Sequence, residues 1–218
     1  MLVRIFLLGA LLLGILDAHA ASCTAHRVSV TANAALNPTV GTLARAELNR
    51  RMFGFAPARM NRGVVQGLTE ARSEYAYELT LTETVSPRSG KPCFSAQVQV
   101  DMTYVDVAVF IARELEPNSC GDHLVRKHEM AHVQVYRNNR ASAPRAVAGA
   151  LQSALRGQAF TGRTPAEARR AAEEGLAREI ASAVRAHVAK TRPLHAQLDA
   201  TDNLDEARVA CERERSNS

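Results

Sequence analysis

The amino-acid sequence predicts an α+β fold in which a small antiparallel sheet is followed by a helical half. Between residues 75 and 104, apolar and polar residues alternate over two stretches, which is the period of half-buried strands. From residue 122 onward, the apolar residues recur with a helical period instead. The chain has 218 residues, a length that suits one compact domain with a core of its own.

The first twenty residues have the features of a secretory signal peptide. Arg4 precedes an apolar run at residues 5–16, and Ala18 and Ala20 supply a small-x-small cleavage site. The run of about a dozen apolar residues is too short to cross a bilayer, which needs roughly 20. We therefore expect residues 1–20 to be removed, leaving a secreted or periplasmic chain over 21–218 without a transmembrane segment.

The N-terminal half should contain strands and one helix. Residues 26–31 have the alternating, β-branched pattern of a strand. Thr42 can cap a helix over residues 43–52, and residues 55–67 should form a loop. Strands over 75–85 and 94–104 flank a turn and should pair as an antiparallel hairpin.

The strand pattern changes phase after residue 104. Apolar residues then occupy odd positions over residues 105–111, which predicts either a bulge or a separate strand. Beyond a loop at 116–121, residues 123–139 should form a helix, and a shorter helix should follow Pro144.

A long helix should begin near residue 165. Thr164 is a capping residue, Pro165 occupies the first helical position, and Glu167 stands three residues after the cap. A final helix is expected from about Pro193.

The charge balance favours anionic partners in general but not nucleic acid in particular. The chain has 27 Lys and Arg against 22 Asp and Glu, a net charge of +5. It has no tryptophan, and its arginines are interleaved with alanine and glutamate rather than with aromatic rings that could stack on bases. We therefore expect no specific nucleic-acid partner.

Four cysteines follow the signal segment, and export to an oxidising compartment predicts two disulfides. Three pairings are possible. Cys23 and Cys93 fall in the strand-rich half, whereas Cys120 and Cys211 bracket the helical half, so we favour 23 with 93 and 120 with 211. None of the cysteines has the spacing of a structural zinc site.

The segment His128-Glu129-Met130-Ala131-His132 has the pattern H-E-x-x-H on a predicted helix. Side chains four residues apart lie on one helical face, so His128 and His132 can reach the same ion. Glu129 is rotated by about 100° and lies beside them, where it can accept a proton from a water activated by zinc. The motif therefore predicts a zinc cofactor with Glu129 as the catalytic base.

With this motif between a strand-rich half and a long helical tail, the chain resembles a zincin. It is more closely similar to the bacterial family of predicted secreted zinc-dependent proteases. The resemblance implies a zincin-like metallopeptidase domain over residues 21–218, with a peptide or protein as substrate. It also implies His128 and His132 as zinc ligands, Glu129 as general base, and an edge strand that holds the substrate, for which residues 105–111 are the candidate.

Catalytic zinc usually has three protein ligands, and the motif supplies two. Asp199 is the first candidate, because residues 198–203 stand where the resembled family carries Tyr-Asp, Thr and His-Gly, and because Cys120 and Cys211 flank it. Glu173 is the next candidate, since it falls on the apolar stripe expected for the long helix.

Three further side chains are candidates for smaller roles. His187 or His195 could supply the third ligand in place of Asp199 or Glu173, and Tyr136 or His195 could donate a hydrogen bond to an oxyanion.

The expected function is that of a secreted zinc peptidase. Two alternatives stay open. One is a zincin-like binding module of the cell envelope that has lost catalysis, which the missing His-Gly pair after residue 203 favours. The other is a zinc amidase that acts on cell-wall peptides.

Overall fold

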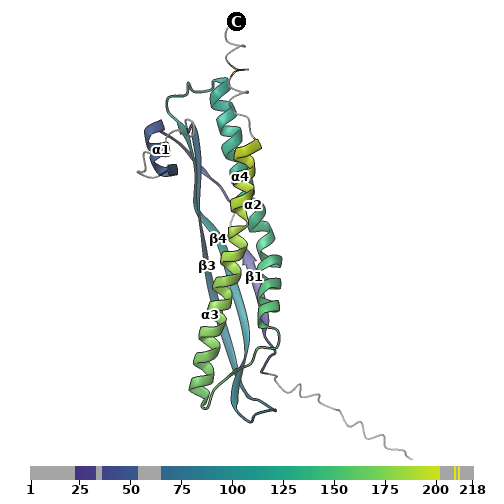
Figure 1. Ribbon diagram of the computed structural model, residues 1–218. Coiled ribbons are helices and arrows are strands. Elements are labelled where there is room, and N and C mark those ends of the chain that lie inside the picture. Colours follow the sequence, from purple (N-terminus) through teal and green to yellow (C-terminus); the bar gives the residue numbers. More distant parts are fainter. Residues whose placement is uncertain (1–22, 33–35, 54–64, 202–208, 210, 212–218) are drawn as a thin grey trace, which may run out of the picture.

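The computed structural model describes residues 23–32, 36–53, 65–201, 209 and 211 (Figure 1). The predicted signal segment and most of the predicted loop at 55–67 lie outside this part of the chain. In chain order, the elements are β1 (Arg27–Ala32), β2 (Thr39–Leu43), α1 (Arg45–Phe53), β3 (Gly67–Val85), β4 (Pro92–Ala112), α2 (Cys120–Leu155), β5 (Phe160–Thr161), α3 (Pro165–Ala189) and α4 (Thr191–Thr201). No helix among the described residues is long and apolar enough to span a membrane.

The long strand β4 organises the sheet. The expected hairpin is confirmed, because β3 pairs antiparallel with β4 from Gly67 opposite Ile111 to Val85 opposite Pro92. The expectation of a purely antiparallel sheet is wrong, since β1 and β2 both run parallel to β4, along residues 97–102 and 108–112. Alternation in a sequence indicates which side chains of a strand are buried, but it carries no information on the direction of a distant partner.

The phase change after residue 104 is a bulge within β4 and not the start of a separate strand. The register shifts there, because Arg72 pairs with Val105 and Glu70 pairs with Ala108. Between these two pairs, β4 therefore contains one residue more than β3. Asp106 adopts a φ of 53°, the left-handed conformation that a bulge residue often needs. The extra residue keeps apolar side chains on the inner face along the whole strand, which buries Val98, Val100, Met102 and Tyr104 before the bulge and Val107, Val109 and Ile111 after it.

Helices α2 and α3 cover one face of this sheet, as Figure 1 shows. The main core is formed where they meet β4, and its helical side chains are Ala143, Val147, Leu151 and Leu155 of α2 and Ala168, Ala172, Leu176, Ile180 and Val184 of α3. A second core cluster lies near the bulge and includes Val125 and Val133 of α2. The second cluster anchors the part of α2 that carries the H-E-x-x-H motif.

The expected helix break near Pro144 is wrong. A single helix of 36 residues runs from Cys120 to Leu155, about 54 Å at 1.5 Å per residue, with Pro144 inside it. A proline within a helix costs about 3 kcal/mol, and burial of large apolar side chains such as Val147 and Leu151 contributes roughly 1.5–3 kcal/mol each. Packing on the sheet therefore outweighs the local penalty.

The helix starts agree with the sequence to different degrees. The predicted cap of α3 is confirmed, because Thr164 Oγ1 accepts a hydrogen bond from the Glu167 N–H at 3.2 Å. Helix α4 begins at Thr191. Helix α1 begins at Arg45 and not at residue 43, because Thr42 belongs to β2, a short strand that the sequence analysis did not recognise.

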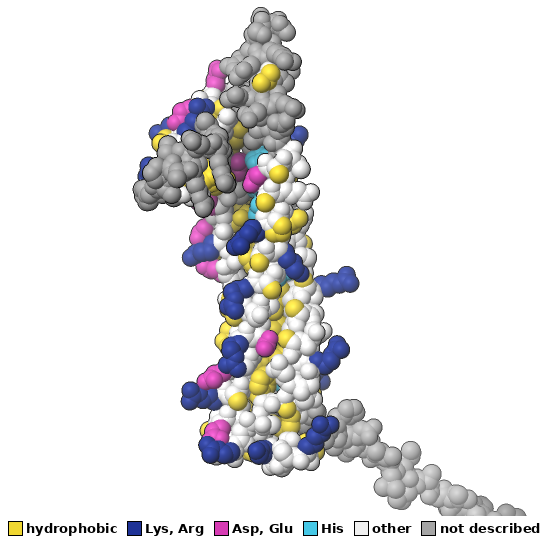
Figure 2. All heavy atoms as spheres, viewed as in Figure 1, with side chains coloured by type: hydrophobic (Ala, Val, Ile, Leu, Met, Phe, Trp, Pro, Cys, Tyr) yellow, Lys and Arg dark blue, Asp and Glu magenta, His cyan; other side chains and the backbone are white. Residues whose placement is uncertain are grey.

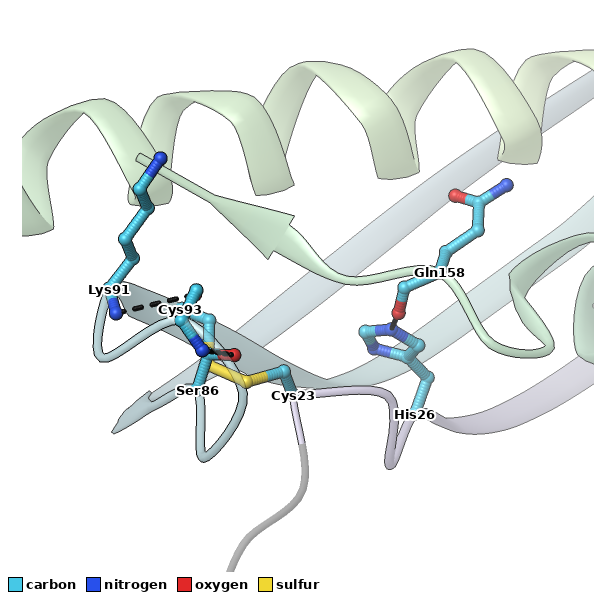
Figure 3. The surroundings of a disulfide bond; sticks show 7 residues. Cys23, His26, Ser86, Lys91, Cys93 and Gln158 are labelled. Atoms are coloured by element: carbon cyan, nitrogen blue, oxygen red, sulfur yellow. Dashed lines mark hydrogen bonds between the residues drawn. A yellow bond between two sulfur atoms is a disulfide. The ribbon is translucent and has the colours of Figure 1, made fainter. Parts of the chain in front are cut away.

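The predicted disulfide pairing is confirmed, with Cys23 bonded to Cys93 and Cys120 bonded to Cys211. Figure 3 shows the first bridge beside the β3–β4 turn, which the hydrogen bond from the Ser86 N–H to the Lys91 carbonyl closes at 2.9 Å. The second bridge ties Cys211 to Cys120, the first residue of α2. Two disulfides fit an oxidising compartment.

Candidate metal centre

Helix α2 holds the three residues of the motif at one site. His128, Glu129 and His132 are 7%, 4% and 8% exposed, so all three side chains are buried. The four-residue spacing places both imidazoles on one helical face, with their Nε2 atoms 3.0 Å apart.

Helix α4 brings Asp199 to these histidines. Its Oδ1 atom lies 3.0 Å from His132 Nε2 and 3.4 Å from His128 Nε2. The side chain of Asp199 is 48% exposed, so the cluster is open to solvent on this side. Figure 2 shows histidine and acidic side chains together at the surface beside α4.

The geometry of the three side chains fits a zinc ion. Tetrahedral zinc with N and O ligands at roughly 2.0–2.2 Å places the ligand atoms about 3.3 Å from one another, close to the separations of 3.0 to 3.4 Å found here. Two imidazoles and one carboxylate are a common set for catalytic zinc, which keeps its fourth position open. Among the residues that the structure describes, His128, His132 and Asp199 are the one group of three or more histidine, cysteine or acidic side chains whose ligand atoms converge closely enough to hold a metal ion.

Strand β3 positions the carboxylate of Glu129. The hydroxyl of Thr69 donates a hydrogen bond to Glu129 Oε2 at 2.7 Å. Burial raises the pKa of Glu129 above its ordinary value, although the hydrogen bond from Thr69 and the neighbouring His128 act in the opposite direction. A carboxylate with a raised pKa is better matched to accepting and returning protons near neutral pH.

Gly67 allows β3 to lie this close to α2. A Cβ atom on Gly67 would be 2.5 Å from Glu129 Oε1 and 2.7 Å from Val125 Cγ1. Both distances are shorter than van der Waals contact allows, so a larger residue would clash. Sequence reasoning placed Gly67 at the end of a loop and missed Thr69 altogether. A glycine at the start of a strand was the available signal, because it often marks the close approach of another element.

Residues 105–111 do not form the separate edge strand expected for substrate, and residues 108–111 are paired on both sides. These residues belong to the central strand β4, which pairs with β3 on one edge and, at residues 108–112, with β2 on the other. The outer strand next to Glu129 is β3, which has no second partner strand within the described part of the chain. The error arose because the phase change could be read as a new strand.

Glu173 does not lie at the site. It is half exposed and forms an ion pair with Arg169 at 2.9 Å on the outer surface of α3. The buried stripe of α3 passes through Ala172 and Leu176 instead, so a helical wheel centred on Ile180 placed Glu173 too close to the core.

His187 is a structural residue of the core. Its Nε2 lies 2.9 Å from the Asn139 carbonyl oxygen, and the Asn139 side-chain amide donates to the His187 carbonyl at 3.1 Å. The Tyr104 hydroxyl donates to Asn139 Oδ1 at 2.7 Å, and burial raises the pKa of Tyr104 to about 12. This network joins α2, α3 and β4, and it does not include His128, His132 or Asp199.

His195 lies beside the cluster of His128, His132 and Asp199 but is not part of it. Its Nδ1 is 2.8 Å from Nδ1 of His132, the ring nitrogen that faces away from Asp199. Burial lowers the pKa of His195, His132 lowers it further, and Asp199 opposes the shift. Tyr136 packs on the His195 ring with the ring centres 4.6 Å apart.

A cavity of about 490 Å³ lies at the start of α2. Gln66 and Val125 line this cavity. Gln66 is next to Gly67 in the sequence, and Val125 lies one helical turn before Glu129. Glu114 also lines the cavity. Its two carboxylate oxygens accept hydrogen bonds from the Arg45 backbone N–H at 3.0 and 3.1 Å, and these bonds lower the pKa of Glu114. The other lining residues include Leu115, Pro117, Leu124 and the Cys120–Cys211 pair.

Comparison of the chain with models of protein families, with curated proteins and with solved structures finds no match.

Proposed function

We propose that this protein is an exported zinc-dependent peptidase of the zincin type. One observation carries the proposal. A buried carboxylate, that of Glu129, is next in sequence to His128, which forms a cluster with His132 and Asp199. The two disulfides support a site of action outside the reducing cytosol.

The ligand roles follow from the geometry. His128 and His132 would bind the ion through Nε2, and Asp199 would bind it through Oδ1. Zinc bound there would lower the pKa of a water molecule and polarise the carbonyl of the scissile amide. The exposed side of Asp199 leaves a route by which substrate can reach the cluster.

Glu129 would act as general base and then as general acid. It would accept the proton of the attacking water and return it to the leaving amine, so that protons balance over the reaction. The Thr69 hydroxyl holds one carboxylate oxygen at 2.7 Å, which orients the side chain and leaves the other oxygen, Oε1, for the water.

The substrate would lie along the outer edge of β3. Gly67 and Thr69 of this strand are in contact range of Glu129, so a peptide added as a further strand would pass close to the catalytic base. The cavity beside Gln66 and Val125 would receive a side chain next to the cleaved bond.

Glu129→Gln tests this proposal. The amide has the size of the carboxylate but cannot accept the proton, so peptide hydrolysis should fall by about 10²-fold or more while zinc binding is retained. Hydrolysis would be followed with a quenched peptide library, with and without a chelator. Glu174→Gln, on the surface of α3 and paired with Arg170, is the matched control and should keep wild-type activity.

A wild-type protein that binds zinc without cleaving any peptide would contradict the peptidase and favour the binding module. Chelator-sensitive cleavage restricted to cell-wall peptides would instead favour the zinc amidase.

A further inference from the structure

Helix α4 brings two side chains to His132, on opposite sides of its ring. His195 and Asp199 are four residues apart, so they lie on the same face of α4. Asp199 approaches Nε2 of His132 and His195 approaches Nδ1, at 3.0 Å and 2.8 Å. The imidazole of His132 therefore stands between His195 and the metal cluster, and His195 is not a ligand.

We infer that His195 is a positioning residue that accepts a hydrogen bond from Nδ1–H of His132 and so directs the Nε2 lone pair of His132 toward the metal. The inference rests on the proposed zinc site. When two imidazole nitrogens are 2.8 Å apart, one must donate and the other accept. A neutral imidazole that binds zinc through Nε2 has its proton on Nδ1, so His132 is the donor and His195 Nδ1 the acceptor.

Aromatic packing holds the acceptor in place. The ring of Tyr136 lies 4.6 Å from that of His195, and the ring of Tyr104 lies 5.1 Å from that of Tyr136. The Tyr104 hydroxyl is fixed in turn by Asn139. The His195 ring is thus supported by α2 and β4, the same elements that position His132.

The remaining nitrogen of His195 gives a second argument. In this tautomer its proton is on Nε2, which is buried without a hydrogen-bond partner among the described residues. A buried donor without a partner costs stability, and a phenyl ring would avoid that cost at this position. Folding alone therefore does not account for a histidine here, whereas a role in orienting a metal ligand does.

Zinc affinity of His195 variants tests the inference. His195→Phe keeps a ring but removes the acceptor, and it should weaken zinc binding by about 10- to 100-fold. His195→Gln keeps an acceptor oxygen and should stay within a few-fold of wild type. His123→Gln removes an exposed histidine of α2 as the matched control and should have no effect. Affinities would be measured by competition with a chromophoric chelator, and wild-type affinity in His195→Phe would overturn the inference.

Nitrogen NMR of the zinc-loaded wild type tests it without any substitution, in case His195→Phe does not fold. His132 should be protonated at Nδ1 and His195 at Nε2, and the reverse assignment would overturn the inference. If zinc affinity depends on His195 but no peptide is hydrolysed, only the proposed peptidase fails. If the wild type binds no zinc, both fail.

Discussion

At the scale of single residues, Gly67 controls how closely β3 approaches the Glu129 side chain. We predict that Gly67→Ala lowers peptide hydrolysis by at least about tenfold, because the added methyl would displace Glu129 or Val125. Overpacking at this contact should also cost about 1–3 kcal/mol of unfolding free energy. Zinc affinity should be unchanged, since the three proposed ligands are not touched.

Gly149→Ala is the control for this variant. Nothing lies within 4 Å of the added Cβ at that position of α2, so stability should rise by up to about 1 kcal/mol with activity unchanged. Wild-type turnover in Gly67→Ala would show that β3 does not constrain Glu129.

Local spacing predicted part of the site, and long-range contacts supplied the rest. The pair His128 and His132 follows from a four-residue repeat on one helix, so its convergence could be read from the sequence. The resemblance and the flanking cysteines are what predict Asp199 as a ligand. The role of Thr69 is not predictable from the sequence, because its hydrogen bond to Glu129 joins residues 60 positions apart and produces no periodic pattern in the sequence.

At the scale of elements, the bulge of β4 depends on a residue that tolerates the left-handed conformation. We predict that Asp106→Val destabilises the protein by about 1–2 kcal/mol, because a β-branched side chain is strained at a φ of 53°. Unfolding in urea would measure this. Asp106→Gly is the matched control: it loses the same exposed ion pair with Arg72 but is free of strain, so it should be at least as stable as wild type. Equal stability of the valine and glycine variants would contradict this account.

Element types were more predictable than their directions and lengths. Strict alternation predicted the β3–β4 hairpin, and a capping pattern at Thr164 predicted the start of α3. The parallel pairing of β1 and β2 was not predictable, because it depends on a partner more than 60 residues away. The continuity of α2 through Pro144 was also missed, since the packing that favours it comes from β4 and α3.

At the scale of the whole molecule, one disulfide involves Cys93 at the start of β4 and the other Cys120 at the start of α2, and these two starts lie at opposite ends of the elongated structure (Figure 1). The two disulfides close loops of similar sequence separation, 70 and 91 residues. Removing either bridge should therefore lower the free energy of unfolding by a similar amount, about 2–5 kcal/mol. Of the two bridges, the second joins Cys211, which follows Asp199 in the sequence, to Cys120 at the start of α2. We predict that Cys120→Ser with Cys211→Ser weakens zinc binding by about tenfold or more, because Asp199 is then less constrained.

The variant that combines Cys23→Ser and Cys93→Ser is the control for this prediction. Its zinc affinity should match wild type at a temperature where both variants are folded. Equal zinc affinities for the two double variants would show that α4 is held at the site without help from the Cys120–Cys211 bridge.

The measurement that tests the account most directly is equilibrium zinc binding by the oxidised protein, by its Asp199→Asn variant and by its Glu173→Gln variant. We predict one zinc ion per chain for the wild type, an affinity at least about tenfold weaker for Asp199→Asn, and wild-type affinity for Glu173→Gln, which lies on the outer surface of α3. A wild-type protein that binds no zinc, or an Asp199→Asn variant that binds it equally well, would contradict the account.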